Sequence, residues 1–135
     1  MSGPSLDAVL DTLLPGDADW PAGGVLGLAA TVATDIGADA LRALLDRLPP
    51  DFASGDADRR EATLRAIESE LPEVFARLVD AAYLAYYTAP RVRTVIERVT
   101  GYAARPPQPL GYELEPFDER LLDKQRQRAP FWRKA

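Results

Sequence analysis

The residue types that most often carry catalysis or bind metals are scarce in this chain. Its 135 residues include no histidine and no cysteine. Histidine is the usual general base near neutral pH and the commonest metal ligand, and the cysteine thiolate is the usual sulfur nucleophile. The composition therefore excludes histidine-based triads, imidazole-bound metal centres and disulfides within the chain.

Acidic residues are plentiful, but their spacing matches no ligand or acid–base pattern. Asp17 with Asp19, and Asp56 with Asp58, resemble the opening of a calcium loop. Other residue types stand where that loop needs its turn glycine and its closing acid. The three glycines within 23–27 match no nucleotide-binding fingerprint, so close helix packing is the better interpretation. We therefore expect no catalytic, cofactor-binding or metal-binding residue, and no enzyme activity, in this chain.

Aromatic residues give a stronger signal. Tyr83 and Tyr87 are four residues apart and share one side of a predicted helix, with Tyr86 beside them. They either pack in the chain's own core, with their hydroxyls reaching water or a carbonyl, or face a partner, since tyrosine and tryptophan are enriched at interfaces. The candidate partner-binding residues are Tyr83, Tyr87, Tyr102, Arg105, Pro106, Pro107, Pro109, Tyr112, Phe117, Phe131, Trp132 and Arg133.

The charge distribution argues against nucleic acid as a partner. The net charge is −5, whereas phosphate binding needs a basic surface. Every acidic residue precedes Lys124, and the only charged residues from Lys124 to the end are the basic residues Lys124, Arg126, Arg128, Arg133 and Lys134. This basic end is either a solvated terminus or a docking patch for an acidic partner.

The elements that would position these residues are helices, because apolar residues recur at three- and four-residue spacing and strand alternation is missing. Proline and glycine mark several boundaries, and a cap resembling a capping box is expected at Asp58. We expect a helix that ends at Pro15-Gly16, helices over 22–36, 38–48 and 58–71, a central helix from Pro72, a helix from Pro90 that Gly101 ends, and a short helix over 118–128 with Leu121 and Leu122 facing inward.

These signals predict an all-α fold in a single domain. Residues 1–101 would form a compact bundle of five to six helices, and residues 102–135 an extended C-terminal arm rich in proline and aromatic residues. The helix over 22–36 is apolar on nearly all sides, so we expect it at the centre of the bundle. The arm either wraps the chain's own helices or contacts another protein, and its prolines and basic end favour the second.

No segment is expected to enter a membrane or direct export. The most apolar run, 25–33, is far shorter than the roughly 20 residues that cross a bilayer. The N-terminus has no signal peptide pattern, and the Arg-Arg pair at 59–60 is internal, which rules out a twin-arginine signal. The sequence as given therefore predicts a cytoplasmic protein.

Four pieces of sequence occur in an order that resembles a known family. They are L-L-P-G at 13–16, D-W-P-A at 19–22, A-Y-x-A-Y-Y-T-x-P at 82–90, and G-Y-x-x-R-P-P-Q-P-x-G-Y-E at 101–113. In this order they resemble the gluconate 2-dehydrogenase subunit 3 family, over residues from about 6 to 132.

The resemblance implies a non-catalytic small subunit that binds and stabilises a large FAD-dependent oxidoreductase of the glucose-methanol-choline (GMC) type. The large subunit would carry the FAD and oxidise a sugar, polyol or sugar acid, and a cytochrome or another acceptor would take electrons through it. Small subunits of this family often carry an export signal, and this sequence departs from that pattern. The alternatives are a stand-alone helical adaptor or regulatory protein with an unrelated partner, and, with least support, a small enzyme that uses tyrosine or carboxylates.

Overall fold

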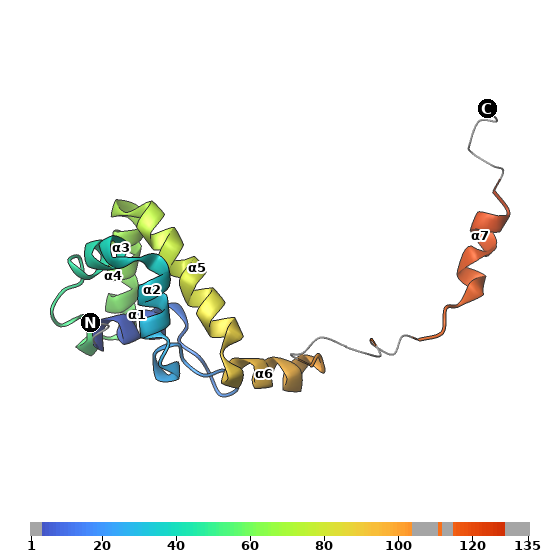
Figure 1. Cartoon of the computed structure of the whole chain (residues 1–135), viewed down its shortest axis with the longest axis horizontal. Helices are drawn as coiled ribbons and strands as arrows, with labels where there is room; N and C mark the ends of the chain where they lie inside the picture. The colour runs from blue at the N-terminus through green and yellow to red at the C-terminus, as the bar shows by residue number, and fades with distance from the viewer. Residues whose placement is uncertain (1–3, 104–110, 112–114, 129–135) are drawn as a thin grey trace, which may run out of the picture. The chain divides into compact units, whose positions relative to one another are not determined.

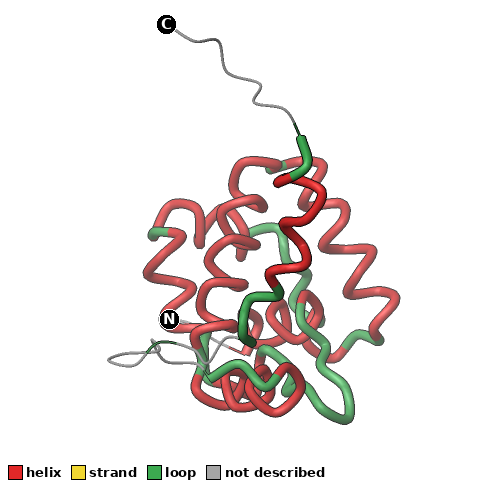
Figure 2. Tube along the Cα trace, turned by 90° about the vertical axis from the view of Figure 1, so that its right-hand side faces the viewer, coloured by secondary structure: helices red, strands yellow, loops and turns green. Residues whose placement is uncertain are grey.

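The computed structural model describes residues 4–103, 111 and 115–128 of the chain. Within these residues it contains seven α-helices, three short 3-10 helices and no strand (Figure 1, Figure 2). The predicted all-α fold is confirmed for the described part of the chain. The chain divides into two units, Met1–Ala104 and Arg105–Ala135.

The first unit is built from helices joined by short loops. In chain order they are α1 (Pro4–Leu13), η1 (Gly24–Leu26), α2 (Ala29–Ile36), α3 (Ala38–Leu45), η2 (Phe52–Ser54), α4 (Ala57–Glu70), α5 (Pro72–Thr88) and α6 (Pro90–Thr100).

Helix α5 is the central element of this unit, as the sequence predicts. It contacts α2, α3, α4 and α6, and it crosses the unit next to α2 in Figure 1. Its buried residues Phe75, Leu78, Ala82 and Ala85 recur at three- and four-residue spacing, so they form one side of the helix. Helix α1 adds Leu6, Val9 and Leu10, which are fully buried. The core therefore lies between α1, α2, α4 and α5.

The predicted helix over 22–36 is wrong. A 3-10 turn and a left-handed Gly27 (φ 68°) come first, and α2 begins only at Ala29. The amide of Gly24 donates to Asp11 Oδ1 at 2.7 Å, which ties the turn to α1 instead of continuing a helix. Helix α2 buries three residues on one side and exposes Ala30, Thr31, Thr34 and Asp35, so it is amphipathic and is not the fully buried centre of the bundle. Asp19 and Pro21 lie in the loop before this turn, outside any helix.

Several predicted helix boundaries are confirmed because proline or glycine sets them. Pro72 and Pro90 occupy the first turns of α5 and α6. Ala89, the residue before Pro90, is extended (ψ 133°), as steric contact with a following proline favours. Gly101 is left-handed (φ 73°) and ends α6.

The start of α4 differs from the prediction by two residues. Asp56, and not Asp58, is the cap: its carboxylate accepts the N–H of Arg59 at 2.8 Å. An N-cap needs an extended backbone, and Asp56 has it (ψ 170°), whereas Asp58 lies inside the first helical turn. Helix α3 is also shorter than predicted and ends at Leu45, followed by a turn.

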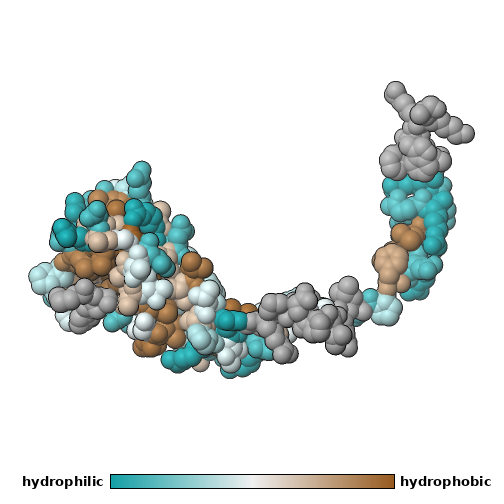
Figure 3. Space-filling view, viewed as in Figure 1, coloured by the Kyte–Doolittle hydropathy of each residue, from teal (hydrophilic) through white to brown (hydrophobic). Residues whose placement is uncertain are grey.

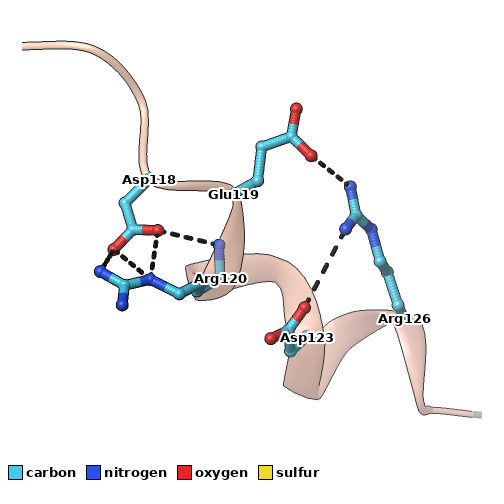
Figure 4. A network of polar contacts seen from close by, with 5 residues as sticks. All are labelled: Asp118, Glu119, Arg120, Asp123 and Arg126. Carbon is cyan, nitrogen blue, oxygen red and sulfur yellow. Dashed lines mark hydrogen bonds and ion pairs between the residues drawn. The ribbon is translucent and has the colours of Figure 1, made fainter.

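The described part of the second unit contains η3 (Glu119–Leu122) and α7 (Asp123–Arg126). Asp118 accepts the N–H of Arg120 and pairs with its guanidinium at 2.9 Å (Figure 4). Arg126 pairs with Glu119 at 3.4 Å on the same short segment. All these groups are exposed, so the contacts order the two turns and add little stability.

Leu121 and Leu122 do not face inward, which corrects the prediction. Both side chains are exposed, because the two short turns η3 and α7 do not enclose a core of their own. In the space-filling view a small apolar group interrupts the polar surface around α7, and further apolar residues reach the surface of the first unit (Figure 3).

Candidate functional site

The loop between α1 and η1 is held in one shape by its own polar groups. Asp17 Oδ1 accepts the N–H groups of Asp19 and Trp20 at 2.8 and 2.9 Å, and the Asp17 amide donates to the Trp20 carbonyl at 2.9 Å. The Gly23 amide donates to the Leu14 carbonyl at 2.8 Å, which closes the loop at its base. The backbone of Trp20 is thereby held in place within the loop.

Gly16 is required at the first bend of this loop. Its φ is +70°, in the left-handed region that favours glycine. A Cβ atom there would lie 2.6 Å from the Trp20 carbonyl oxygen and from the Ala22 amide nitrogen. Only glycine allows this close approach of two backbone segments.

Tyr86 joins the loop to α5. Its hydroxyl donates to the Pro21 carbonyl at 2.8 Å, across 65 residues of sequence, and its side chain is buried. An ion pair of 2.8 Å between Arg98 and Asp19 connects the same loop to α6, although both groups are exposed. The loop, α5 and α6 therefore meet at one side of the first unit.

A groove of about 340 Å³ lies where the loop meets α5. The residues that line it are Leu13, Leu14, Pro15, Gly16, Asp17, Trp20, Tyr83, Tyr86 and Tyr87. A smaller hollow of about 30 Å³ shares Leu13, Leu14 and Tyr83 and continues toward Val79. This surface is called the aromatic groove below.

The three tyrosines of the aromatic groove contact one another. The rings of Tyr83 and Tyr87 are stacked with centroids 6.1 Å apart, and the rings of Tyr86 and Tyr87 meet edge to face at 5.3 Å. These are favourable aromatic geometries. Tyr86 is buried, whereas Tyr83 and Tyr87 remain 47% and 50% exposed. Buried Tyr86 thus packs against Tyr87, which stacks on Tyr83, and the two half-exposed rings present apolar surface to solvent.

The aromatic groove has an acidic character. Burial raises the pKa of Tyr86 above its ordinary value, and the nearby Tyr87 and Asp17 raise it further. The N–H groups of Trp20 and Asp19 lower the pKa of the Asp17 carboxyl, so this group is ionised at neutral pH. None of the residues that line the groove is basic. Binding of a phosphate or of a sugar acid carboxylate is therefore disfavoured here.

The predicted site residues fall into two groups. Tyr83 and Tyr87 lie together in the aromatic groove, while Tyr102 in the first unit and Phe117 in the second are exposed by 68% and 63%. The remaining predicted residues, Arg105, Pro106, Pro107, Pro109, Tyr112, Phe131, Trp132 and Arg133, lie outside the described residues.

The sequence prediction missed Trp20, Tyr86 and Asp17 as members of the site. Trp20 was visible as an aromatic residue in a loop rich in proline and glycine, and Tyr86 as the neighbour of Tyr87. Nothing in the sequence indicated that residues near 20 and near 86 lie together. Their pairing depends on how the loop after α1 packs against α5.

The part of the chain that the structure describes offers neither a metal-binding cluster nor a membrane-spanning helix. Residues 4–103, 111 and 115–128 contain no group of three or more acidic, histidine or cysteine side chains that could hold a metal ion. None of the helices in those ranges has the length and apolar content needed to span a bilayer. Comparison with protein-family models, with curated proteins and with solved structures finds no match to this chain.

Proposed function

We propose that this chain is a non-catalytic small subunit that binds and stabilises a large FAD-dependent oxidoreductase of the GMC type, which acts on a sugar, polyol or sugar acid. The chain itself would hold no cofactor. Its aromatic groove would contact the large subunit, and the proline-rich and aromatic residues after Gly101 would add further contacts. An electron acceptor such as a cytochrome would interact through the large subunit.

One observation carries this proposal. Three of the four sequence pieces that resemble gluconate 2-dehydrogenase subunit 3 line the same groove, although 13–16 and 82–90 are far apart in the sequence. The loop containing 19–22 is attached to α5 through Tyr86. If the similarity to the family were due to chance, the separate sequence pieces would have no reason to meet on one surface. A binding surface shared with the family explains why they do.

The surface chemistry also supports protein binding over catalysis. Half-exposed tyrosines fit the centre of an interface, where aromatic side chains contribute large contact areas at a small entropic cost. The apolar stripe of α6 also supports protein binding, because Val92 is fully buried whereas Val99 near the end of the helix is exposed. Such a stripe is complete only if another surface covers its last turn.

Co-expression tests the proposal. The chain is produced together with a GMC-type flavoprotein encoded by a neighbouring gene and separated by size exclusion, with absorbance read for protein and for flavin. We expect the chain to elute with the flavin in one complex, and the flavoprotein to melt at a higher temperature when the chain is present. Elution of the two proteins apart, with no change in melting temperature, would contradict the proposal and favour an unrelated partner.

A further inference from the structure

The lining of the aromatic groove is rich in rings. Trp20 and Pro15 come from the loop after α1, and the stacked pair Tyr83 and Tyr87 comes from α5. Rigid aromatic grooves bind proline rings well, because the rings pack flat and a polyproline II segment loses little conformational entropy on binding.

The polar groups of the groove suit an extended segment better than a helix. Tyrosine hydroxyls and the tryptophan indole N–H are hydrogen-bond donors. A polyproline II segment leaves its carbonyl groups without internal partners, whereas the carbonyls along a helix are already bonded within it. Tyr83 and Tyr87 are half exposed, so their hydroxyls can reach such carbonyls.

The charge of the groove lining indicates which residue type would lie at one end of a bound extended segment. Among the residues that line the groove, Asp17 is the only charged one, and it is exposed to solvent. An arginine or lysine next to the prolines would be attracted to this carboxylate, and an acidic residue would be repelled. The lining thus combines an apolar aromatic floor with a single negative charge.

We propose that the aromatic groove binds a proline-rich segment of a partner protein, in polyproline II conformation, with a basic residue beside Asp17. This assignment rests on the proposed function in one respect, that the groove faces a protein partner. It does not depend on that partner being a flavoprotein.

Fluorescence anisotropy on the full-length chain tests this assignment. The probe is a labelled ten-residue peptide with one arginine followed by prolines, compared with a glutamine-for-arginine version and with a glycine/serine peptide of equal length. We expect saturable binding of the arginine peptide, weaker binding of the glutamine peptide by about two- to fivefold at low salt, and none of the glycine/serine peptide.

Matched variants locate the binding surface. Tyr87→Ala, and separately Tyr83→Ala, should weaken the arginine peptide by about tenfold or more. Leu84→Ala is the control, because Leu84 is also exposed on α5 but lines a different hollow with Asp35 and Arg77. Asp17→Asn keeps an oxygen that can accept the loop N–H groups, and it should abolish the preference for arginine over glutamine. Circular dichroism checks that each variant is folded.

Several results would overturn the assignment. These are no saturation up to about 1 mM peptide, equal binding of the glycine/serine peptide, or equal losses in Leu84→Ala and Tyr87→Ala. A wild-type chain that self-associates and becomes monomeric on Tyr87→Ala would assign the groove to a second copy instead. A flavoprotein complex that forms although no peptide binds would overturn this inference and leave the proposed function standing.

Discussion

The hydrogen bond between Tyr86 and Pro21 should hold the two sides of the aromatic groove together, and Tyr86→Phe removes it without changing the shape of the ring. The bond is 2.8 Å long and partly buried. Its loss costs about 0.5–1.5 kcal/mol net, and leaving the Pro21 carbonyl without a donor moves the cost toward about 1–3 kcal/mol. We expect the free energy of unfolding to fall by about 1–2 kcal/mol. For a small domain each kcal/mol lowers the melting temperature by roughly 4–8 °C.

Urea unfolding followed by circular dichroism measures this loss, and Tyr83→Phe is the matched control. The Tyr83 side chain is half exposed, so removing its hydroxyl should change the stability by less than about 0.5 kcal/mol. Tyr86→Phe should also weaken partner binding, because the loop that carries Trp20 is no longer tied to α5. Equal stabilities of Tyr86→Phe, Tyr83→Phe and wild type would refute the role given to this hydrogen bond.

Tyr86 also predicts how stability changes at alkaline pH. Burial and the nearby Tyr87 and Asp17 raise its pKa in the folded chain above the ordinary value of 10.0. Below pH 10 the hydroxyl is protonated in both the folded and the unfolded chain. As the pH rises from 10 toward the raised folded pKa, the unfolded chain releases this proton first, so stability falls. The fall should be smaller in Tyr86→Phe, and identical alkaline unfolding curves would contradict the prediction.

Three further predictions concern the core, the loop and its acid. Leu78→Ala should lower the free energy of unfolding in urea by about 2–5 kcal/mol, because Leu78 is fully buried. Leu84 is exposed, so Leu84→Ala should change it by no more than about 0.5 kcal/mol. Similar losses in the two variants would argue against α5 as the central helix. Gly16→Ala should destabilise the chain more than Gly27→Ala. Both glycines are left-handed, which costs an alanine about 1–2 kcal/mol at either position, but only at Gly16 would the new Cβ atom also clash with backbone atoms, at 2.6 Å. The pKa of Asp17 is lowered from 3.8, so the stability that its ionised carboxylate contributes is lost as the pH falls below about 4. The melting temperature of Asp17→Asn should therefore depend less steeply on acid pH, and an unchanged slope would be evidence against the loop hydrogen bonds.

The sequence predicts the helices best where a residue has a strong backbone preference. Pro72, Pro90 and Gly101 mark helix boundaries in the structure as expected, because proline lacks an amide donor and glycine adopts the left-handed cap. The segment 22–36 fails for the opposite reason. Alanine is compatible with both buried and exposed helix faces, and the Asp11 contact that holds Gly24 comes from another helix.

The candidate site could be predicted only in part for the same physical reason. Helical spacing correctly places Tyr83 and Tyr87 on one side of a helix, and both remain half exposed. Periodicity describes one helix at a time and contains no information about its neighbour. The groove exists because a loop near Trp20 packs against the end of α5, and this tertiary contact could not be read from either segment alone.

The most direct test of the central claim is the affinity of the large flavoprotein for three forms of this chain: wild type, the double variant Tyr83→Ala/Tyr87→Ala, and Leu84→Ala. Isothermal titration calorimetry gives the three dissociation constants. We predict tight, stoichiometric binding of wild type and Leu84→Ala, and weakening by about tenfold or more, or about 1.4 kcal/mol, for the double variant. Equal affinities of all three forms, or no binding of the wild-type chain, would contradict the account.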